Sequence, residues 1–229
     1  MLLRRVHSAA SGAVQRRACL TTMPVSGGMA VDLSGRVACV TGAKQGFGRA
    51  TADRLAEFGA EVICADIDPS IVSDERISDN RRQHGVVCDV ADVGSVQAMC
   101  DEAVSSLGRL DIMVCNAGVL WSTRILDITP QEWRATMDVN LDGVFFCVQA
   151  AAKAMVAQGE GGRIVTISSS AGRSVSTVGG CHYTASKAGV LGISRAAAHE
   201  LAGSDITVNA VCPGLFETEM VMENVHAWG

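Results

Sequence analysis

Short apolar runs alternate along this chain with longer stretches in which apolar residues recur at helical spacing. From Asp32 onward, six of the apolar runs predict strands. They cover residues 37–40, 61–66, 85–90, 110–115, 162–169 and 206–211. Strands that are apolar on nearly every residue are buried on both faces. This is typical of a parallel sheet that lies between two layers of helices.

The stretches between these runs predict helices. Their approximate ranges are 49–58, 92–107, 130–157 and 183–201. Gly59 and Gly108 follow the first two, and glycine commonly ends a helix. The third range consists of two helical stretches that meet near Asn140, whereas the polar residues 70–83 show no clear period. We therefore expect a single α/β domain over residues 30–229, a doubly wound parallel sheet of the Rossmann-like type.

Composition narrows the classes of partner. The net charge of −5 argues against nucleic acid, and no apolar run reaches the roughly 18 residues that would span a membrane, so no membrane partner is expected. The nine cysteines show no CxxC spacing and no accompanying histidine pair. We therefore expect buried thiols in a reducing compartment and no metal site.

The first 31 residues differ from the rest of the chain. They hold Arg4, Arg5, Arg16 and Arg17 with several Ser and Ala, and no acidic residue precedes Asp32. This composition predicts a mitochondrial targeting leader over residues 1–29 and a location in the mitochondrial matrix. The alternatives are a disordered tail and a cytoplasmic protein.

A glycine-rich turn joins the first predicted strand to the first helix. It has the sequence Thr41-Gly42-Ala43-Lys44-Gln45-Gly46-Phe47-Gly48. The glycines permit a tight turn and let a pyrophosphate approach the backbone, while the helix beyond supplies N–H groups and a partial positive charge. The spacing G-x₃-G-x-G at this position predicts a dinucleotide site.

An acidic residue near the second strand bears on the choice of nucleotide. Asp66 ends that strand, where its carboxylate can accept hydrogen bonds from both ribose hydroxyls and would repel a 2′-phosphate. Gln45, not a basic residue, precedes Gly46, and Lys44 lies one place earlier. NAD is therefore favoured over NADP. Asp68 lies nearby and could share the role of Asp66.

The only tyrosine of the chain, Tyr183, is followed four residues later by Lys187. This spacing is about one helical turn, so the two side chains would share a face. The ammonium group would lower the pKa of the phenol toward neutral pH, as an acid/base group requires.

Further motifs follow in a recognisable order. They are Asp89-Val90, Asn116-Ala117-Gly118, Asn140, Ser169, Tyr183-x-x-x-Lys187 and Val208-Asn209-Ala210-Val211-Cys212-Pro213-Gly214. With them, the chain from about Leu33 to Met220 resembles the short-chain dehydrogenase/reductase family, and within it the 3-oxoacyl-carrier-protein reductases and related ketone and alcohol enzymes. The resemblance implies hydride transfer between a nicotinamide cofactor and a small-molecule secondary alcohol or ketone.

The resemblance also implies roles for single residues. Tyr183 would be the acid/base, Lys187 would activate it and bind the nicotinamide ribose, Ser169 would hold the substrate oxygen, and Asn140 would hold a relay water. The cofactor would lie against Thr41, Gly42, Gln45, Gly46, Phe47, Gly48, Asp66, Asp89, Val90, Asn116, Ala117, Gly118, Tyr183, Lys187, Pro213, Gly214 and Thr218.

Two points stay open in the choice of serine and in the length of the chain. Strand register selects Ser169, whereas counting back from Tyr183 at the family's usual spacing selects Ser170; we favour Ser169 because loops absorb insertions. Family members usually continue beyond the segment that here contains Thr218. We therefore expect the last strand and the substrate-covering helices to be missing.

This length leaves two functional hypotheses. The chain is an NAD-dependent enzyme, or it is a shortened, non-catalytic form that binds cofactor or sister subunits; an NAD-binding redox sensor is a third, weaker hypothesis. The resemblance further implies a homo-oligomer, a dimer or tetramer, built through the Tyr183 helix and the helix before it.

Overall fold

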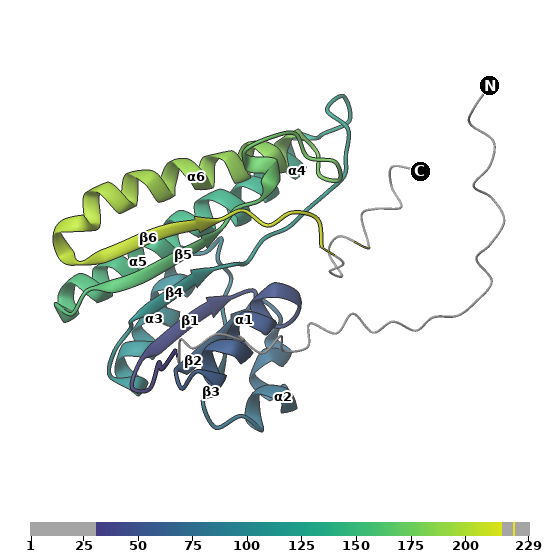
Figure 1. Cartoon of the computed structure of the whole chain (residues 1–229). Coiled ribbons are helices and arrows are strands. Elements are labelled where there is room, and N and C mark those ends of the chain that lie inside the picture. The colour runs from purple at the N-terminus through teal and green to yellow at the C-terminus, as the bar shows by residue number, and fades with distance from the viewer. Residues whose placement is uncertain (1–30, 217–221, 223–229) are drawn as a thin grey trace.

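The computed structural model describes residues 31–216 and residue 222. They form a six-stranded parallel sheet with the strand order β3-β2-β1-β4-β5-β6 (Figure 1). The strands are β1 (Val37–Thr41), β2 (Glu61–Asp66), β3 (Gln83–Val87), β4 (Ile112–Cys115), β5 (Gly162–Ile167) and β6 (Ile206–Val211). The predicted leader, residues 1–29, lies outside the described residues, as does Thr218.

The chain winds outward in both directions from the centre of this sheet. It proceeds from β1 to β3 on one side, returns to place β4 beside β1, and then proceeds to β6 on the other. The predicted doubly wound sheet is therefore confirmed. Connections diverge between β1 and β4, which leaves a crevice at the carboxyl ends of the strands. In the described part of the chain, β6 is an edge strand.

Helices cover both faces of the sheet. The helices are α1 (Gly46–Glu57), α2 (Glu75–Ser78), α3 (Val93–Leu107), α4 (Pro130–Met137), α5 (Gly143–Gln158) and α6 (Cys181–Leu201). Short turns of helix are η1 (Pro69–Ser73), η2 (Asp138–Asp142), η3 (Ser170–Gly172) and η4 (Ala202–Ser204).

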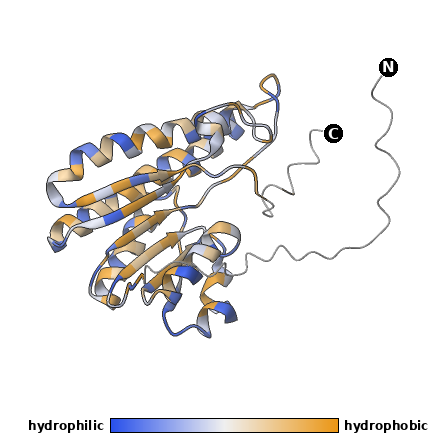
Figure 2. Ribbon diagram, in the orientation of Figure 1, coloured by the Kyte–Doolittle hydropathy of each residue, from blue (hydrophilic) through white to orange (hydrophobic). Residues whose placement is uncertain are grey.

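The alternation of residues along β1 shows how the two layers form. Val37 and Cys39 pack into a core with α3, α5 and α6, whereas Ala38 and Val40 pack into a second core with α1, η1 and α2. Successive strand residues point to opposite faces, so a run that is apolar throughout supplies both cores. Figure 2 shows the apolar residues concentrated in the strands between the helices.

The third strand begins two residues earlier and ends three residues earlier than predicted. It was expected over 85–90 and is found at Gln83–Val87. The register pairs Val62 of β2 with Gln83, and the strand ends before Asp89, whose carboxylate accepts a hydrogen bond from the Ala91 backbone N–H at 2.9 Å. This local turn removes Asp89 and Val90 from the strand and places them at the edge of the crevice.

The predicted helix boundaries hold within three residues. Helix α3 begins after Asp92, whose side chain accepts from the Gly94 N–H at 2.9 Å, and ends at Gly108 with φ of 83°. The two helical stretches expected to meet near Asn140 are α4 and α5, joined by the π-helical turn η2 that contains Asn140. The unassigned residues 70–83 form most of η1, then α2 and the start of β3.

The continuous helical stretch Pro130–Gln158 is apolar enough, by length and composition alone, to cross a membrane. Half of its apolar window is buried in the protein, where α5 packs against α3 and the sheet. It is therefore accounted for as a core helix, although no single apolar run in the sequence reaches that length.

Most of the scattered cysteines lie in the cores, as predicted. Six of the eight described are buried, whereas Cys181 is exposed and Cys212 is half-buried. Burial raises the pKa of Cys64 to about 12 and that of Cys88 to about 11, so these thiols stay protonated at neutral pH. In the described part of the chain, no group of three or more His, Cys, Asp or Glu could hold a metal ion.

Candidate active site

A cleft of about 460 Å³ lies at the carboxyl ends of the strands. Fifteen of the predicted site residues line it: Gly42, Gln45, Gly46, Phe47, Asp66, Asp89, Val90, Asn116, Ala117, Gly118, Ser169, Tyr183, Lys187, Pro213 and Gly214. Motifs spread over more than 170 residues of sequence thus converge at the point where the strand order reverses, the usual position of a ligand in this type of sheet.

Thr41, Gly48 and Asn140 support this cleft from behind and do not line it. The Thr41 Oγ1 accepts the backbone N–H groups of Asn116 at 3.0 Å and Ala117 at 3.1 Å. In return, the Asn116 side chain donates to the carbonyl groups of Thr41 at 2.9 Å and Gly42 at 3.2 Å. These bonds fasten the glycine-rich turn to the end of β4.

Glycine is needed at different positions of the turn for different physical reasons. Gly42 and Gly46 have φ of 65° and 58°, a region that side chains disfavour. Gly48 is helical, but a β-carbon there would overlap the Gly42 carbonyl oxygen. Helix α1 can therefore begin directly against the turn, which leaves the first N–H groups of the helix facing the cleft. No side chain caps them, since Gln45 makes no capping bond.

Two carboxylates lie at the end of β2. The two oxygens of Asp66 accept backbone N–H groups, Oδ2 from Lys44 at 3.0 Å and Oδ1 from Asp68 at 3.1 Å. The Asp68 Oδ1 accepts from the N–H of Ser70 at 2.9 Å and from its hydroxyl at 2.7 Å, and these bonds lower the pKa of Asp68. Asp66 and Asp68 both line the cleft, so both stay at the position expected for an adenosine ribose.

The other end of the cleft holds Tyr183, Lys187 and Ser169. Tyr183 and Lys187 lie one turn apart on α6, with the Lys187 Nζ 5.8 Å from the centre of the phenol ring. The Lys187 ammonium donates to the Ile167 carbonyl oxygen at 2.9 Å. The Ser169 side chain lines the cleft with Tyr183 and acts to lower the pKa of its phenol. A substrate oxygen placed here would meet two hydroxyl groups.

The three consecutive serines after β5 have different surroundings. Ser168 is buried and donates to the Lys187 carbonyl at 2.8 Å. Ser169 lines the cleft, whereas Ser170 is exposed, lies outside it and donates its backbone N–H to the Pro213 carbonyl at 2.8 Å. The serine favoured by strand register, Ser169, is therefore the one that lines the cleft with Tyr183, and Ser170 does not.

Asn140 is fully buried behind the cleft. Its Oδ1 accepts from the Val119 N–H at 2.8 Å, and its Nδ2 donates to the Val119 carbonyl at 2.9 Å and to Ser186 Oγ at 3.2 Å. Gly118 lies between it and Lys187, since a β-carbon at Gly118 would be 3.2 Å from Asn140 Oδ1 and 3.4 Å from Lys187 Nζ. Asn140 thus ties the loop after β4 to α6; its side-chain bonds do not by themselves indicate a relay water.

The pKa of Tyr183 beside Lys187 differs from the expectation. Burial raises the pKa of Tyr183, with the hydrogen bond from Ser169 acting in the opposite direction. The expected lowering by Lys187 is not found in the protein alone. The physical reason is that burial lowers the pKa of Lys187 to about 8, so the lysine is already neutral over the higher pH range in which the phenol loses its proton. Activation of the phenol therefore depends on what fills the cleft.

The shifted pKa of Lys187 predicts a pH-dependent stability. Because the folded pKa of about 8 lies below the unfolded value, the unfolded chain binds more protons between about pH 8 and pH 10. The free energy of unfolding of the parent chain, taken relative to Lys187→Met, should rise by about 2 kcal/mol from pH 7.5 to pH 10. Urea titrations of both chains measure it, and the buried thiols cancel in the difference. A flat or falling difference would contradict the buried, shifted lysine.

The sequence analysis did not identify several residues of the site. Val119, Leu120, Val139, Ile167 and Phe216 also line the cleft. The position of Val119 and Leu120, directly after the Asn116-Ala117-Gly118 motif, was an available signal. The ring of Phe216 packs edge-on against Phe47, with centroids 5.0 Å apart, and nothing in the sequence indicated that pairing.

A buried contact beside Tyr183 also escaped the sequence analysis. His182 is fully buried, and its Nε2 lies 3.0 Å from the Glu132 Oε1, at an angle that does not make a hydrogen bond. The His182 ring stacks on Trp121 at 6.3 Å between centroids, and the Trp121 carbonyl accepts the Gly180 N–H at 2.9 Å. Trp121 therefore packs beside α6 and does not line the cleft.

Several known proteins are similar to this chain in sequence. The sequence profile of the short chain dehydrogenase family matches residues 36–228. The chain is 38% identical over 199 residues to a 3-oxoacyl-[acyl-carrier-protein] reductase of Synechocystis, covering 85% of this chain and 79% of that protein. It is 37% identical over 193 residues to a 2-dehydro-3-deoxy-D-gluconate 5-dehydrogenase of Escherichia coli, covering 82% and 75%.

A solved structure is similar over the same region. A short-chain type dehydrogenase/reductase from Mycobacterium marinum superimposes with a TM-score of 0.80 at 39% sequence identity, covering 86% of this chain and 80% of that one.

Proposed function

The chain belongs to the short-chain dehydrogenase family of oxidoreductases, and we propose that it transfers a hydride between a nicotinamide cofactor and a secondary alcohol or ketone. The observation that carries this proposal is the contact between Tyr183 and Ser169 in the cleft, with Lys187 one helical turn away. Two hydroxyl groups directed to one position are what a reacting carbonyl oxygen requires.

The proposed chemistry divides between cofactor and protein. A bound nicotinamide would supply or accept the hydride. Tyr183 would donate a proton to the substrate oxygen during reduction and accept it during oxidation, while Ser169 would hold that oxygen by a second hydrogen bond. Lys187 would bind the nicotinamide ribose hydroxyls from the floor of the cleft. The first turn of α1 would bind the pyrophosphate through its backbone N–H groups.

We propose NAD as the cofactor because of the charges at the ribose position. Asp66 and Asp68 line that end of the cleft, and a 2′-phosphate would meet like charge there. The ammonium group of Lys44 is bonded to the Ser70 hydroxyl at 2.5 Å and lies 3.5 Å from a carboxylate oxygen of Asp74. The positive charge of Lys44 is thus directed toward Ser70 and Asp74.

The first test is thermal unfolding of the full chain with and without saturating NADH and, separately, NADPH. A ligand at 100 times its dissociation constant adds about 2.7 kcal/mol to the free energy of unfolding, a shift of several degrees. We expect NADH to raise the transition temperature more than NADPH does. A larger shift with NADPH would reverse the assignment of the cofactor. No shift with either would favour the non-catalytic form.

The proposed substrate class follows the names of the relatives. One relative is named a reductase of a 3-oxoacyl group and another a dehydrogenase of a deoxygluconate. A ketone or its secondary alcohol is common to both kinds of chemistry. Val119, Leu120 and Phe216 contribute apolar side chains to the lining of the cleft, which supports a substrate with an uncharged group.

We further propose that a second copy of this chain covers the outer face of α5 and α6. A groove of about 540 Å³ lies between these helices, and apolar side chains supply most of its lining, including Phe145, Val148, Val156 and Ile193. Phe145 and Val156 are 45% and 49% exposed, an arrangement typical of an unfilled helical interface.

The variant Phe145→Arg should weaken self-association by at least about 100-fold, because it places a charge among the apolar side chains of the groove. Light scattering during size-exclusion chromatography measures the molar mass. Val104→Arg on α3 is the matched control, since Val104 is 42% exposed on a different helix. Equal masses for the two variants would exclude this face as the interface.

A further inference from the structure

We propose that Asp74 is a second determinant of cofactor choice, because it holds Lys44 and Arg76 in a charge cluster and so withholds them from a 2′-phosphate. The inference rests on the proposed function, since it concerns the adenosine end of the same cleft. It assigns a role to a residue outside the cleft lining.

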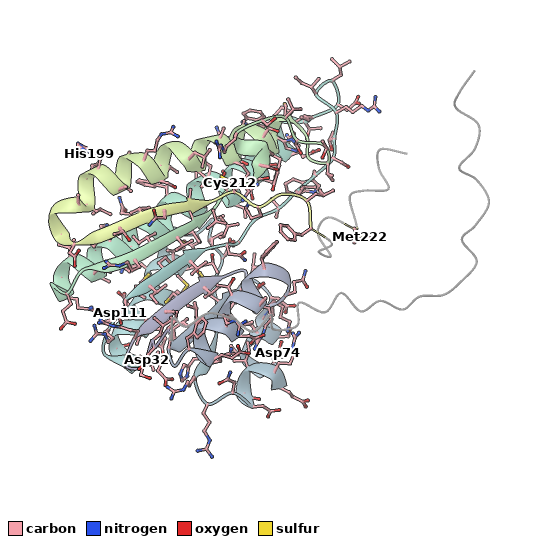
Figure 3. All side chains as sticks on the ribbon, in the orientation of Figure 1. Asp32, Asp74, Asp111, His199, Cys212 and Met222 are labelled. Atoms are coloured by element: carbon pink, nitrogen blue, oxygen red, sulfur yellow. The ribbon has the colours of Figure 1, made fainter. Side chains whose placement is uncertain are left out.

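The Asp74 carboxylate contacts two segments, the glycine-rich turn through Lys44 and the start of α2 through Arg76. Its side chain is only 7% exposed, and it precedes α2 as the N-cap residue. Oδ2 accepts from Arg76 Nη2 at 2.6 Å and lies 3.5 Å from Lys44 Nζ. Oδ1 accepts from the Arg76 backbone N–H and from Nε, both at 3.0 Å. Figure 3 labels Asp74 beside α2.

Both cations lie close to the ribose position. Lys44 lines the cleft with Asp66, and its backbone N–H donates to Asp66 Oδ2 at 3.0 Å. The Arg76 Nη2 donates to the Lys44 carbonyl at 3.2 Å, so the arginine reaches the glycine-rich turn itself. Lysine and arginine are the side chains that bind phosphate. These two cations are outnumbered by three carboxylates, those of Asp66, Asp68 and Asp74.

The ion pairs of Asp74 with Lys44 and Arg76 persist over the working pH range. Hydrogen bonds from Arg76 hold the pKa of Asp74 well below its usual range, and the charges of Arg76 and Lys44 act in the same direction. Asp74 therefore stays ionised wherever the protein is folded at ordinary pH.

The arrangement predicts that the two acids act together. Replacing Asp66 alone lowers the negative charge at the ribose, where Asp68 remains, but leaves the cations paired to Asp74. Replacing Asp74 alone releases charge that a 2′-phosphate still cannot approach past Asp66. Only the double replacement both lowers the negative charge at the ribose and releases a cation. Its effect on the dissociation constant of NADPH should therefore exceed the product of the two single effects.

The test measures dissociation constants of NADH and NADPH by fluorescence titration of the full chain. The variants are Asp66→Asn, Asp74→Asn and the double variant, with Glu75→Gln as the control, an exposed acid one residue further along α2. Asparagine keeps the N-cap function at position 74, so α2 is retained. In the Asp66→Asn background, Asp74→Asn should tighten NADPH relative to NADH about tenfold, the effect of one partly screened charge pair.

Adding Lys44→Met to the double variant should remove most of this gain. Additive effects of the two replacements, or a gain equal to that of Glu75→Gln, would overturn the role of Asp74 and leave the proposed function intact. A parent chain that binds neither cofactor would overturn the proposed function and this inference together. Thermal unfolding of each variant shows that it is folded before its affinities are compared.

Discussion

Replacement of Tyr183 by phenylalanine is expected to lower kcat by about 10²–10⁴-fold, the range supplied by a positioned acid/base. The substitution removes only the hydroxyl group, so the ring still packs over Gly179, whose β-carbon position lies 2.7 Å from the Tyr183 ring. The contacts proposed for the cofactor with Lys187 and with the glycine-rich turn do not involve this hydroxyl group. The dissociation constant of NADH should therefore stay within about twofold of the parent value.

Steady-state reduction of a ketone panel with NADH measures kcat, and fluorescence titration measures the affinity for NADH. The serines provide a matched pair of controls. Ser169→Ala should lower kcat because Ser169 contacts Tyr183, whereas Ser170→Ala should not, since Ser170 is exposed outside the cleft. A phenylalanine variant that reduces a substrate at a rate near that of the parent would exclude Tyr183 as the acid/base.

The parts of this molecule that sequence could predict are those dictated by local chemistry. Asp92 and Gly108 mark both ends of α3 because a side-chain cap and a left-handed glycine are needed at those positions. The apolar runs predicted a buried parallel sheet since each strand supplies both cores, as Val37 and Ala38 show in β1. The convergence of Asp66, Asn116 and Tyr183 then follows from parallel strands, whose carboxyl ends meet at one edge.

The parts that sequence could not predict depend on contacts between distant segments. The limits of β3 are set by its pairing with β2. Strand β4 begins only after Asp111, because the carboxylate of Asp111 accepts hydrogen bonds from Arg36, Arg109 and the Val37 N–H. The pKa of a group likewise depends on burial. Spacing placed Lys187 beside Tyr183, but it could not show that burial would shift both groups toward their neutral forms.

The second large effect is expected at Gly48, where alanine should destabilise the chain by about 3 kcal/mol and abolish the cofactor-dependent stabilisation. A β-carbon at this position overlaps the Gly42 carbonyl oxygen and lies 2.5 Å from the Asn116 side-chain nitrogen. Backbone cannot rotate aside as a side chain can, so α1 must move away from the turn. The same movement breaks the Asn116 bonds to Thr41 and Gly42, which fasten the turn to β4.

Thermal unfolding with and without NADH measures both consequences. The transition temperature should fall by about 6–12 °C for a domain of this size, and NADH should no longer raise it. Gly94→Ala is the matched control, because Gly94 is also helical, is exposed in the first turn of α3, and has only an ordinary contact of 3.4 Å at its β-carbon position. If Gly48→Ala unfolds like Gly94→Ala and still responds to NADH, the close approach of α1 to the turn does not form the cofactor site. A loss of the response in Gly48→Ala alone would locate the pyrophosphate site at the first turn of α1, independently of any substrate.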